Sequence, residues 1–232
     1  MKQRSIEIAT FVLFLLPLLL ILANPTVQGF ALGSDQPAVR SATAPVQTTF
    51  YGMGGLYDGW VLESGEFTGI GGSMNTANTT LIMGDDVANR QYRAIITFNT
   101  ALLPPTASIQ SATIYLTGAG IYGISPFIWS DLKADVKSGF FGSTKYVQLI
   151  DFQAASSFAA VGSQPSCAAT GSCLIPLSGR AFPFINRYGL TQFRLRFALD
   201  DNNNKKPDYY KAFSGDTTAL RARPLLVVKY YP

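Results

Sequence analysis

The chain has 232 residues, of which 47% are hydrophobic and only 14% are charged, and its formal net charge is +4. This composition excludes an intrinsically disordered chain, and the small, dispersed positive charge argues against a nucleic-acid partner, which requires a basic patch or stripe. The absence of histidine excludes a Ser-His-Asp triad, a histidine general base and a histidine-ligated zinc site, so no enzyme is expected.

The N-terminal segment carries the features of a secretory signal. After a short basic start, residues 8–23 are almost wholly apolar, a run shorter than the roughly 20 residues of a membrane-spanning helix. We interpret residues 1–31 as a signal peptide with a hydrophobic helix; an uncleaved anchor is the alternative and would be the chain's membrane contact. Residues 32–49 are rich in Ser, Thr, Ala and Pro and predict a linker, and residues 50–232 predict one extracellular or cell-surface domain.

Beyond the linker, short runs show the period-2 alternation of half-buried strands. Tyr92, Ala94, Ile96 and Phe98 share one face of such a strand and are expected in the core. The other predicted strands, the strongest first, cover residues 112–117, 192–199, 225–231, 59–63, 80–83, 131–137 and 146–150. Arg90 and Arg93 lie at the start of the strand that carries Tyr92, and we expect them to form edge or inter-strand salt bridges.

Helical signals are few. Residues 151–161 and 177–188 predict short helices with Asp151 and Ser178 as their N-caps. Many short strands, frequent turns and so little helix predict an all-β fold, an antiparallel β-sandwich of the jelly-roll type.

The two cysteines, Cys167 and Cys173, predict a disulfide, since an exported chain passes through an oxidising compartment. A metal site is the alternative. It would need further ligands, and the chain has neither a histidine nor a third cysteine.

The densest polar segment is the loop DDNNNKKPD, residues 200–208. Calcium takes six to eight oxygen ligands, and carboxylates, amides and backbone carbonyls supply them. This chemistry predicts a calcium site whose candidate ligands are Asp200, Asp201, Asn203 and Asp208. The alternative is a polar turn, for which Asn and Asp are the usual residues.

Several aromatic residues lie in or near predicted turns. Flat aromatic faces beside amides suit the binding of sugar rings, which present apolar C–H faces and hydroxyl groups. The alternative for each is ordinary core or edge packing. The candidates for ligand binding are Tyr57, Trp60, Trp129 and Tyr209, and Tyr51 and Tyr210 share the same setting.

Several segments together resemble a known family. Residues 89–116, NRQYRAIITFNTALLPPTASIQSATIYL, residues 191–216 and the final RPLLVVKYY resemble the DNRLRE or disaggregatase-related family of secreted β-sandwich domains. The resemblance extends over residues 57–231. The literal DNRLRE string is absent, and Lys205 and Lys206 stand where acids or glycine are more usual. The resemblance implies an extracellular protein similar to carbohydrate-binding modules.

Two functions follow as hypotheses. The first is a non-catalytic module that binds extracellular polysaccharide or cell-surface components. The second is a structural or adhesive subunit of a coat, filament or matrix, since a sparsely charged surface associates readily with copies of itself.

Overall fold

The computed structural model describes residues 44–232, and this part of the chain is built from β-strands with five short 3-10 helices. The helices are η1 (Gly55–Tyr57), η2 (Pro126–Ile128), η3 (Leu149–Phe152), η4 (Gly179–Phe184) and η5 (Leu220–Ala222). The strands are β1 (Val46–Tyr51), β2 (Gly59–Glu63), β3 (Gly71–Asn75), β4 (Thr80–Asp85), β5 (Gln91–Asn99), β6 (Ser108–Tyr122), β7 (Leu132–Ser138), β8 (Phe158–Gln164), β9 (Thr170–Leu177), β10 (Leu190–Phe197), β11 (Asp208–Phe213) and β12 (Leu225–Tyr231).

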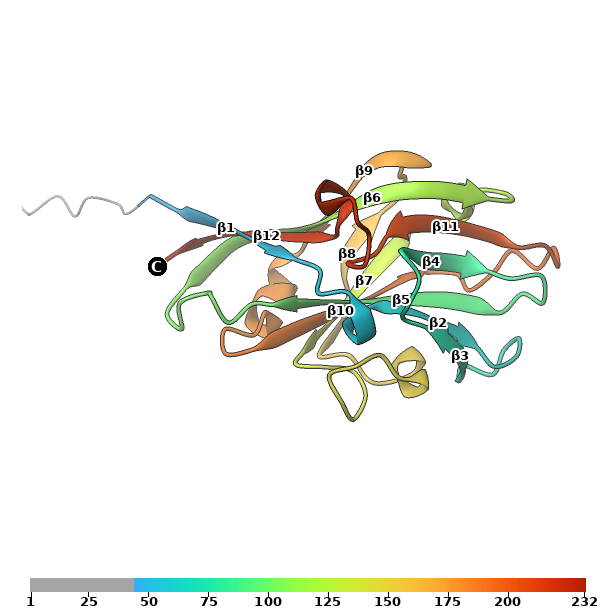
Figure 1. Ribbon diagram of the computed structural model, residues 1–232, viewed down its shortest axis with the longest axis horizontal. Coiled ribbons are helices and arrows are strands. Elements are labelled where there is room, and N and C mark those ends of the chain that lie inside the picture. Colours follow the sequence, from blue (N-terminus) through green and yellow to red (C-terminus); the bar gives the residue numbers. More distant parts are fainter. Residues whose placement is uncertain (1–43) are drawn as a thin grey trace, which may run out of the picture. The chain divides into compact units, whose positions relative to one another are not determined.

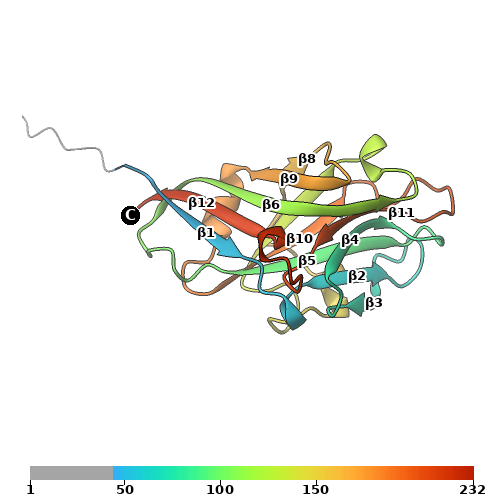
Figure 2. The same cartoon turned by 45° about the horizontal axis from the view of Figure 1, so that its top comes forward.

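All strand pairings are antiparallel and form two rows (Figure 1). One row runs β3-β2-β5-β10-β7-β8, and the other runs β4-β11-β6-β9, with β12 and β1 beside the first half of β6. Figure 2 shows β1, β12 and β6 running side by side in the second row. Short ladders between β4 and β5 and between β8 and β9 join the rows, so the ladder is continuous around one interior. The all-β, antiparallel prediction is confirmed.

The core lies between the two rows. The alternating residues Ala94, Ile96 and Phe98 of β5 point into it, as the sequence predicts, and meet side chains from both rows. Each fully buried large side chain contributes about 1.5–3 kcal/mol of transfer free energy. The largest of these side chains are Tyr210, Phe98, Phe193, Phe197, Leu81, Met83, Ile96, Leu103, Ile114 and Leu116.

The outer face of β5 and β10 is covered rather than solvated. The segment 139–157 folds over this face. Its residues Phe141, Val147 and Phe152 form a second cluster with Val61 of β2 and Ile95 of β5. β5 is therefore buried on both faces, and the expectation of a half-buried strand is wrong here.

Charged side chains are enclosed under the same cover. Asp135 of β7 is fully buried and binds Arg194 (2.9 Å) and Arg196 (3.1 Å) of β10. Arg93 lies in the covered face too, where its guanidinium donates to the Phe152 carbonyl and stacks over the Phe152 ring at 3.9 Å. No ion pair of Arg93 is found among residues 44–232, so its predicted salt bridge is wrong, whereas Arg90 does pair with Asp86.

Local elements agree with the sequence in part. β2 and β12 coincide with the strands predicted at 59–63 and 225–231, but residues 146–150 form no strand. The helix predicted at 151–161 is wrong, because Gln148 and Asp151 close a single 3-10 turn and β8 then pairs with β7. The helix predicted at 177–188 is reduced to η4, and the Ser178 side chain makes no capping hydrogen bond.

The N-terminal predictions fall mostly outside the described residues. The signal peptide at 1–31, its hydrophobic helix and the alternative anchor all lie there. β1 begins at Val46, so the end of the predicted linker 32–49 belongs to the sheet. Within residues 44–232, no helix has the length and apolar character needed to cross a membrane. The predicted Cys167–Cys173 disulfide is confirmed, with the two Cα atoms 5.1 Å apart.

Candidate functional site

Four aromatic side chains meet across four strands and form what we call the aromatic row: Trp60, Tyr92, Tyr209 and Tyr122. Trp60 of β2 contacts Tyr92 of β5 edge-to-face at 5.1 Å between ring centroids. Tyr92 contacts Tyr209 of β11 at 5.9 Å, and Tyr209 stacks on Tyr122 of β6 at 5.2 Å with 12° between the rings. The row is thus a continuous line of π-faces and edges.

The register of the ladders builds this row. Tyr92, Gly84, Tyr209 and Tyr122 lie opposite one another in turn across β5, β4, β11 and β6. Gly84 has a φ of +133°, and a Cβ there would lie 2.2 Å from the Asp208 carbonyl oxygen. Because Gly84 carries no side chain, the ring of Tyr209 reaches Tyr92 across β4.

The members of the row differ in exposure. Tyr122 is 53% exposed, and the other three are partly buried. Burial raises the pKa of Tyr92 and of Tyr209, and a neighbouring tyrosine adds to this for Tyr209, so both hydroxyls stay protonated at neutral pH. The row therefore presents neutral hydrogen-bonding groups beside apolar faces.

Sequence reasoning found only half of this row. It named Trp60 and Tyr209 but assigned Tyr92 to the core by alternation, and it missed Tyr122 at the end of a long strand. The signal that points to them is Gly84, because a glycine in a strand permits close approach of neighbouring groups.

The two other predicted ligand residues lie apart from the row. Tyr57 contacts Tyr146 edge-to-face at 5.1 Å, with the Lys145 ammonium over both rings. Trp129 is partly buried and packs against Phe197 of the core. Trp129 thus fits the packing alternative.

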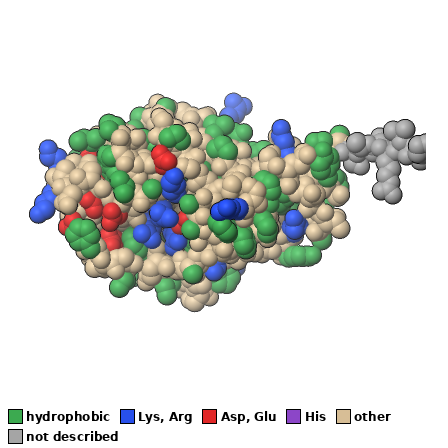
Figure 3. Space-filling model, turned by 180° about the vertical axis from the view of Figure 1, so that it is seen from behind, with side chains coloured by type: hydrophobic (Ala, Val, Ile, Leu, Met, Phe, Trp, Pro, Cys, Tyr) green, Lys and Arg blue, Asp and Glu red, His purple; other side chains and the backbone are tan. Residues whose placement is uncertain are grey.

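The loops and strand ends beside the row carry half of the chain's 14 acidic residues. We call this region the acidic end; it consists of Glu63, Glu66, Asp85, Asp86, Asp200, Asp201 and Asp208. Figure 3 shows acidic side chains gathered toward one side of the molecule, with Lys and Arg side chains next to them. Among residues 44–232, the salt bridge found for this group is that of Arg90 with Asp86.

Asn89 holds three loops of the acidic end together. It is buried, and its amide nitrogen donates to Glu66 and to the Asn203 side chain, both at 3.2 Å. Its amide oxygen accepts the Lys205 backbone N–H at 2.9 Å. The β4–β5, β2–β3 and β10–β11 loops are therefore linked through one side chain.

The predicted calcium ligands do not converge. Asp200 is exposed, Asp201 accepts the Asn203 backbone N–H in a local turn, and the Asn203 side chain faces Asn89. Among residues 44–232, no three Asp, Glu or Cys side chains gather so that they alone could hold a metal. Of the predicted set, only Asp208 is buried.

A different acidic residue stands beside Asp208. Asp85 lies directly opposite it in the β4–β11 ladder and is fully buried, and neither of its carboxylate oxygens has a hydrogen-bond partner. Burial raises the pKa of Asp85 to about 8, and the nearby charge of Asp208 contributes to the shift, followed by that of Asp201. Asp85 is not among the calcium ligands that the sequence predicted.

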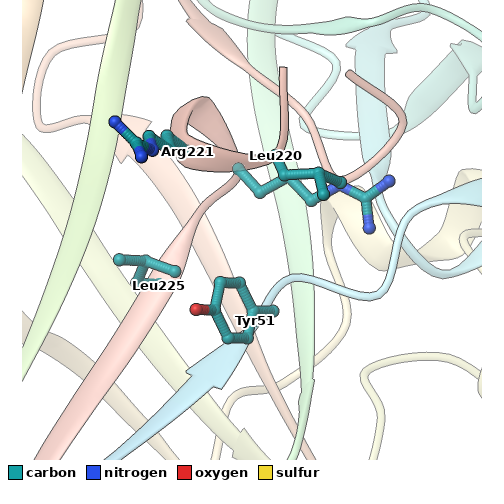
Figure 4. Close-up of a pocket in the computed structure, with 5 residues that line it drawn as sticks. Tyr51, Leu220, Arg221 and Leu225 are labelled. Atoms are coloured by element: carbon teal, nitrogen blue, oxygen red, sulfur yellow. The ribbon is translucent and has the colours of Figure 1, made fainter. Parts of the chain in front are cut away.

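A pocket of about 480 Å³ lies elsewhere, between the end of β1 and the start of β12. It is lined by Tyr51, Leu220, Arg221, Arg223 and Leu225. Figure 4 shows Tyr51 and Leu225 on one side, facing Leu220 and Arg221 of η5. Tyr51, which shares the setting of the ligand candidates in the sequence, lines this pocket, but Tyr57, Trp60, Trp129 and Tyr209 do not.

No family model matches the chain, and no curated protein matches it. Among solved structures, a xylan-binding module CBM15 is similar over 79% of this chain and 96% of its own, with 11% identity and a TM-score of 0.36. Xylanase10C from Cellvibrio japonicus, solved as a mutant in complex with xylopentaose, is similar over 78% of this chain and 28% of its own, with 10% identity and a TM-score of 0.36. These values are too low to assign a family or a ligand, so the resemblance to the DNRLRE family stays a prediction.

Proposed function

We propose that the protein is a secreted, non-catalytic β-sandwich module that binds polysaccharide through the aromatic row. The observation that carries this proposal is the convergence of four aromatic side chains from four strands into one line, with Tyr122 exposed at its end. Sugar rings have apolar C–H faces edged by hydroxyl groups, which match aromatic faces beside neutral hydroxyls.

The charge around the row favours a neutral polysaccharide. Tyr209 and Gly84 are next in sequence to Asp208 and Asp85, so the acidic end directly adjoins the row. The carboxylates of the acidic end repel uronate and sulfate groups of a chain that lies on the aromatic row. Such repulsion selects against anionic polysaccharides.

The burial of the nearest carboxylates supports binding without cleavage. Glycoside hydrolysis uses two carboxyl groups that flank the scissile bond and therefore reach the substrate. Asp85 and Asp208 are 0% and 1% exposed, so they do not contact a chain lying on the row. The disulfide and the predicted signal segment support a location outside the cell.

A comparison of tyrosine variants tests the proposal. We expect the full chain to be retained on insoluble neutral polysaccharides and Tyr122→Ala to weaken its binding about 3- to 10-fold, or ~1 kcal/mol, as expected for the loss of one aromatic contact. Tyr188→Ala is the matched control, because Tyr188 is 80% exposed and lies outside the row. A folded wild type that binds no member of a broad neutral panel, or a Tyr122→Ala variant that binds equally well, would contradict the proposal.

The second candidate function, a structural or adhesive subunit, is favoured by the open sheet edges. Within the described residues, β1 pairs only with β12 and β3 only with β2. Unpaired edges can accept strands from other copies. Sedimentation analysis over a wide concentration range distinguishes the two functions, since a strictly monomeric protein removes this second candidate.

A further inference from the structure

Two buried carboxylates lie together behind the aromatic row and take no part in it. Asp85 and Asp208 are direct partners in the antiparallel β4–β11 ladder. Residues in this relation project from the same face of the sheet, with Cβ atoms about 4.5–5.5 Å apart. Two negative charges at this spacing, away from water, repel each other strongly.

Neither carboxylate is balanced by a positive group. Within residues 44–232, the salt bridges found are those of Asp86, Asp131 and Asp135, and none involves Asp85 or Asp208. Both oxygens of Asp85 lack a hydrogen-bond partner, although buried polar groups are nearly always paired. Asp208 accepts hydrogen bonds from the Ile124 backbone N–H (2.6 Å) and from the Asn202 and Asn204 amides, whereas Asp85 lacks the partner that a buried carboxyl group requires.

Further side chains that carry possible oxygen ligands lie beside Asp208. The side-chain amides of Asn202 and Asn204 point at Asp208 Oδ2, with their nitrogens 2.7 Å and 2.6 Å from it. The amide oxygens of Asn202 and Asn204 accept the backbone N–H groups of Asn204 (3.2 Å) and Lys206 (2.7 Å), and rotation of an amide by about 180° would exchange that hydrogen bond for a cation contact. Asp201 lies close enough to act on the charge of Asp85. The two amides thus meet at Asp208 Oδ2, and Asp85 projects from the same face of the sheet as Asp208.

We infer that Asp85, Asp208, Asn202 and Asn204 form a calcium-binding site at the acidic end. The donors are all hard oxygens, which suits calcium and excludes thiolate or imidazole chemistry. Asp208 is the one ligand shared with the set expected from the sequence. The inference does not depend on the polysaccharide proposal, since the site is defined by its own buried charges.

Calcium titration of the purified full chain tests the site. Calorimetry is expected to show one calcium per chain, with a Kd of about 10⁻⁴ to 10⁻³ M, as in other extracellular modules. At a calcium concentration tenfold above Kd, Tm should rise by about 3–6 °C relative to chelator. Magnesium should give a smaller shift, because it demands near-ideal octahedral geometry.

Two variants locate the site. Asp85→Asn should abolish the calcium-dependent rise in Tm, and in chelator it should melt at or near the wild type, because it replaces a buried carboxyl group that has no hydrogen-bond partner. Asp131→Asn is the matched control, because Asp131 lies on the surface and should leave the calcium response unchanged. If the wild type shows no calcium response, or if Asp85→Asn keeps it, the inference is overturned.

Limited trypsin digestion reports calcium binding locally, at the β10–β11 loop. Lys205 lies exposed in the β10–β11 loop, directly after Asn204. Calcium held by Asn202 and Asn204 should order this loop and slow cleavage after Lys205 severalfold in the wild type but not in Asp85→Asn. Equal cleavage rates with calcium and with chelator in the wild type would count against the site.

Discussion

Tyr209 of β11 lies directly opposite Gly84 of β4, and the missing side chain of Gly84 lets the Tyr209 ring contact Tyr92 on the next strand. A single glycine thus joins aromatic residues of both strand rows. The buried residue Asp85 follows Gly84 in the sequence, and the buried residue Asp208 precedes Tyr209. The candidate binding surface and the candidate cation site therefore share two neighbouring strands.

Replacing this glycine should lower the stability of the fold. In Gly84→Ala, the new Cβ would lie 2.2 Å from the Asp208 carbonyl oxygen and 2.6 Å from the Tyr209 Cα, at a φ of +133°. We expect a loss of about 2–4 kcal/mol in the free energy of unfolding, measured with urea, because backbone strain and a steric clash add.

A second glycine separates these two causes. Gly69 has a φ of +62°, but no atom lies within 4 Å of the position a Cβ would occupy. Gly69→Ala should therefore cost only the conformational penalty of about 1–2 kcal/mol. Equal losses in Gly84→Ala and Gly69→Ala would show that the contact with β11 contributes nothing.

The pH dependence of stability should reveal a buried carboxyl group at Asp58. It is fully buried, and its Oδ2 accepts the Gly215 N–H at 2.6 Å. Burial raises the pKa of Asp58 from 3.8 to about 7, and the charge of the neighbouring Asp216 adds to the shift. Between about pH 4 and pH 7 the folded state holds a proton that the unfolded chain has lost, so the free energy of unfolding falls as the pH rises.

Urea unfolding across this range measures the effect. Asp58 should account for a decline on the order of 2–4 kcal/mol between pH 4 and pH 7. Asp58→Asn cannot ionise and should flatten the profile by that amount, while Asp131→Asn should not. A profile with the same slope in wild type and Asp58→Asn would refute the assignment.

The ion cluster under the covering segment should be far more important for stability than a surface pair. Asp135 binds Arg194 and Arg196 and also accepts the Ala160 N–H at 2.9 Å. Asp135→Asn leaves two guanidinium groups without a counter-charge in a buried setting, so we expect a loss of about 3–5 kcal/mol.

A nearby aspartate provides the comparison. Asp131 pairs with Lys133 at 2.9 Å on the surface, where water screens the interaction. Asp131→Asn should have little effect on the urea midpoint. A comparable loss in both variants would mean that burial of the Asp135 pair adds nothing to stability.

Local pattern was sufficient for much of the sheet. The alternation of Ala94, Ile96 and Phe98 correctly identifies the core face of β5, because one buried face imposes a period of two. The same rule misplaced Tyr92, since the end of β5 leaves the core and faces the aromatic row. It also missed the cover over Arg93, because the covering segment is distant in sequence.

The sequence by itself determined the all-β class of the fold, the disulfide and the absence of histidine, because these depend on composition, local periodicity and the number of cysteines. Only the tertiary structure decided which polar and aromatic residues meet. Asp85 and Asp208 are separated by more than half of the chain, as are Tyr92 and Tyr209. The pairing of β4 with β11 brings the first pair together, and the second pair also needs the pairing of β4 with β5. Strand register is a long-range property, so no window along the chain contains it.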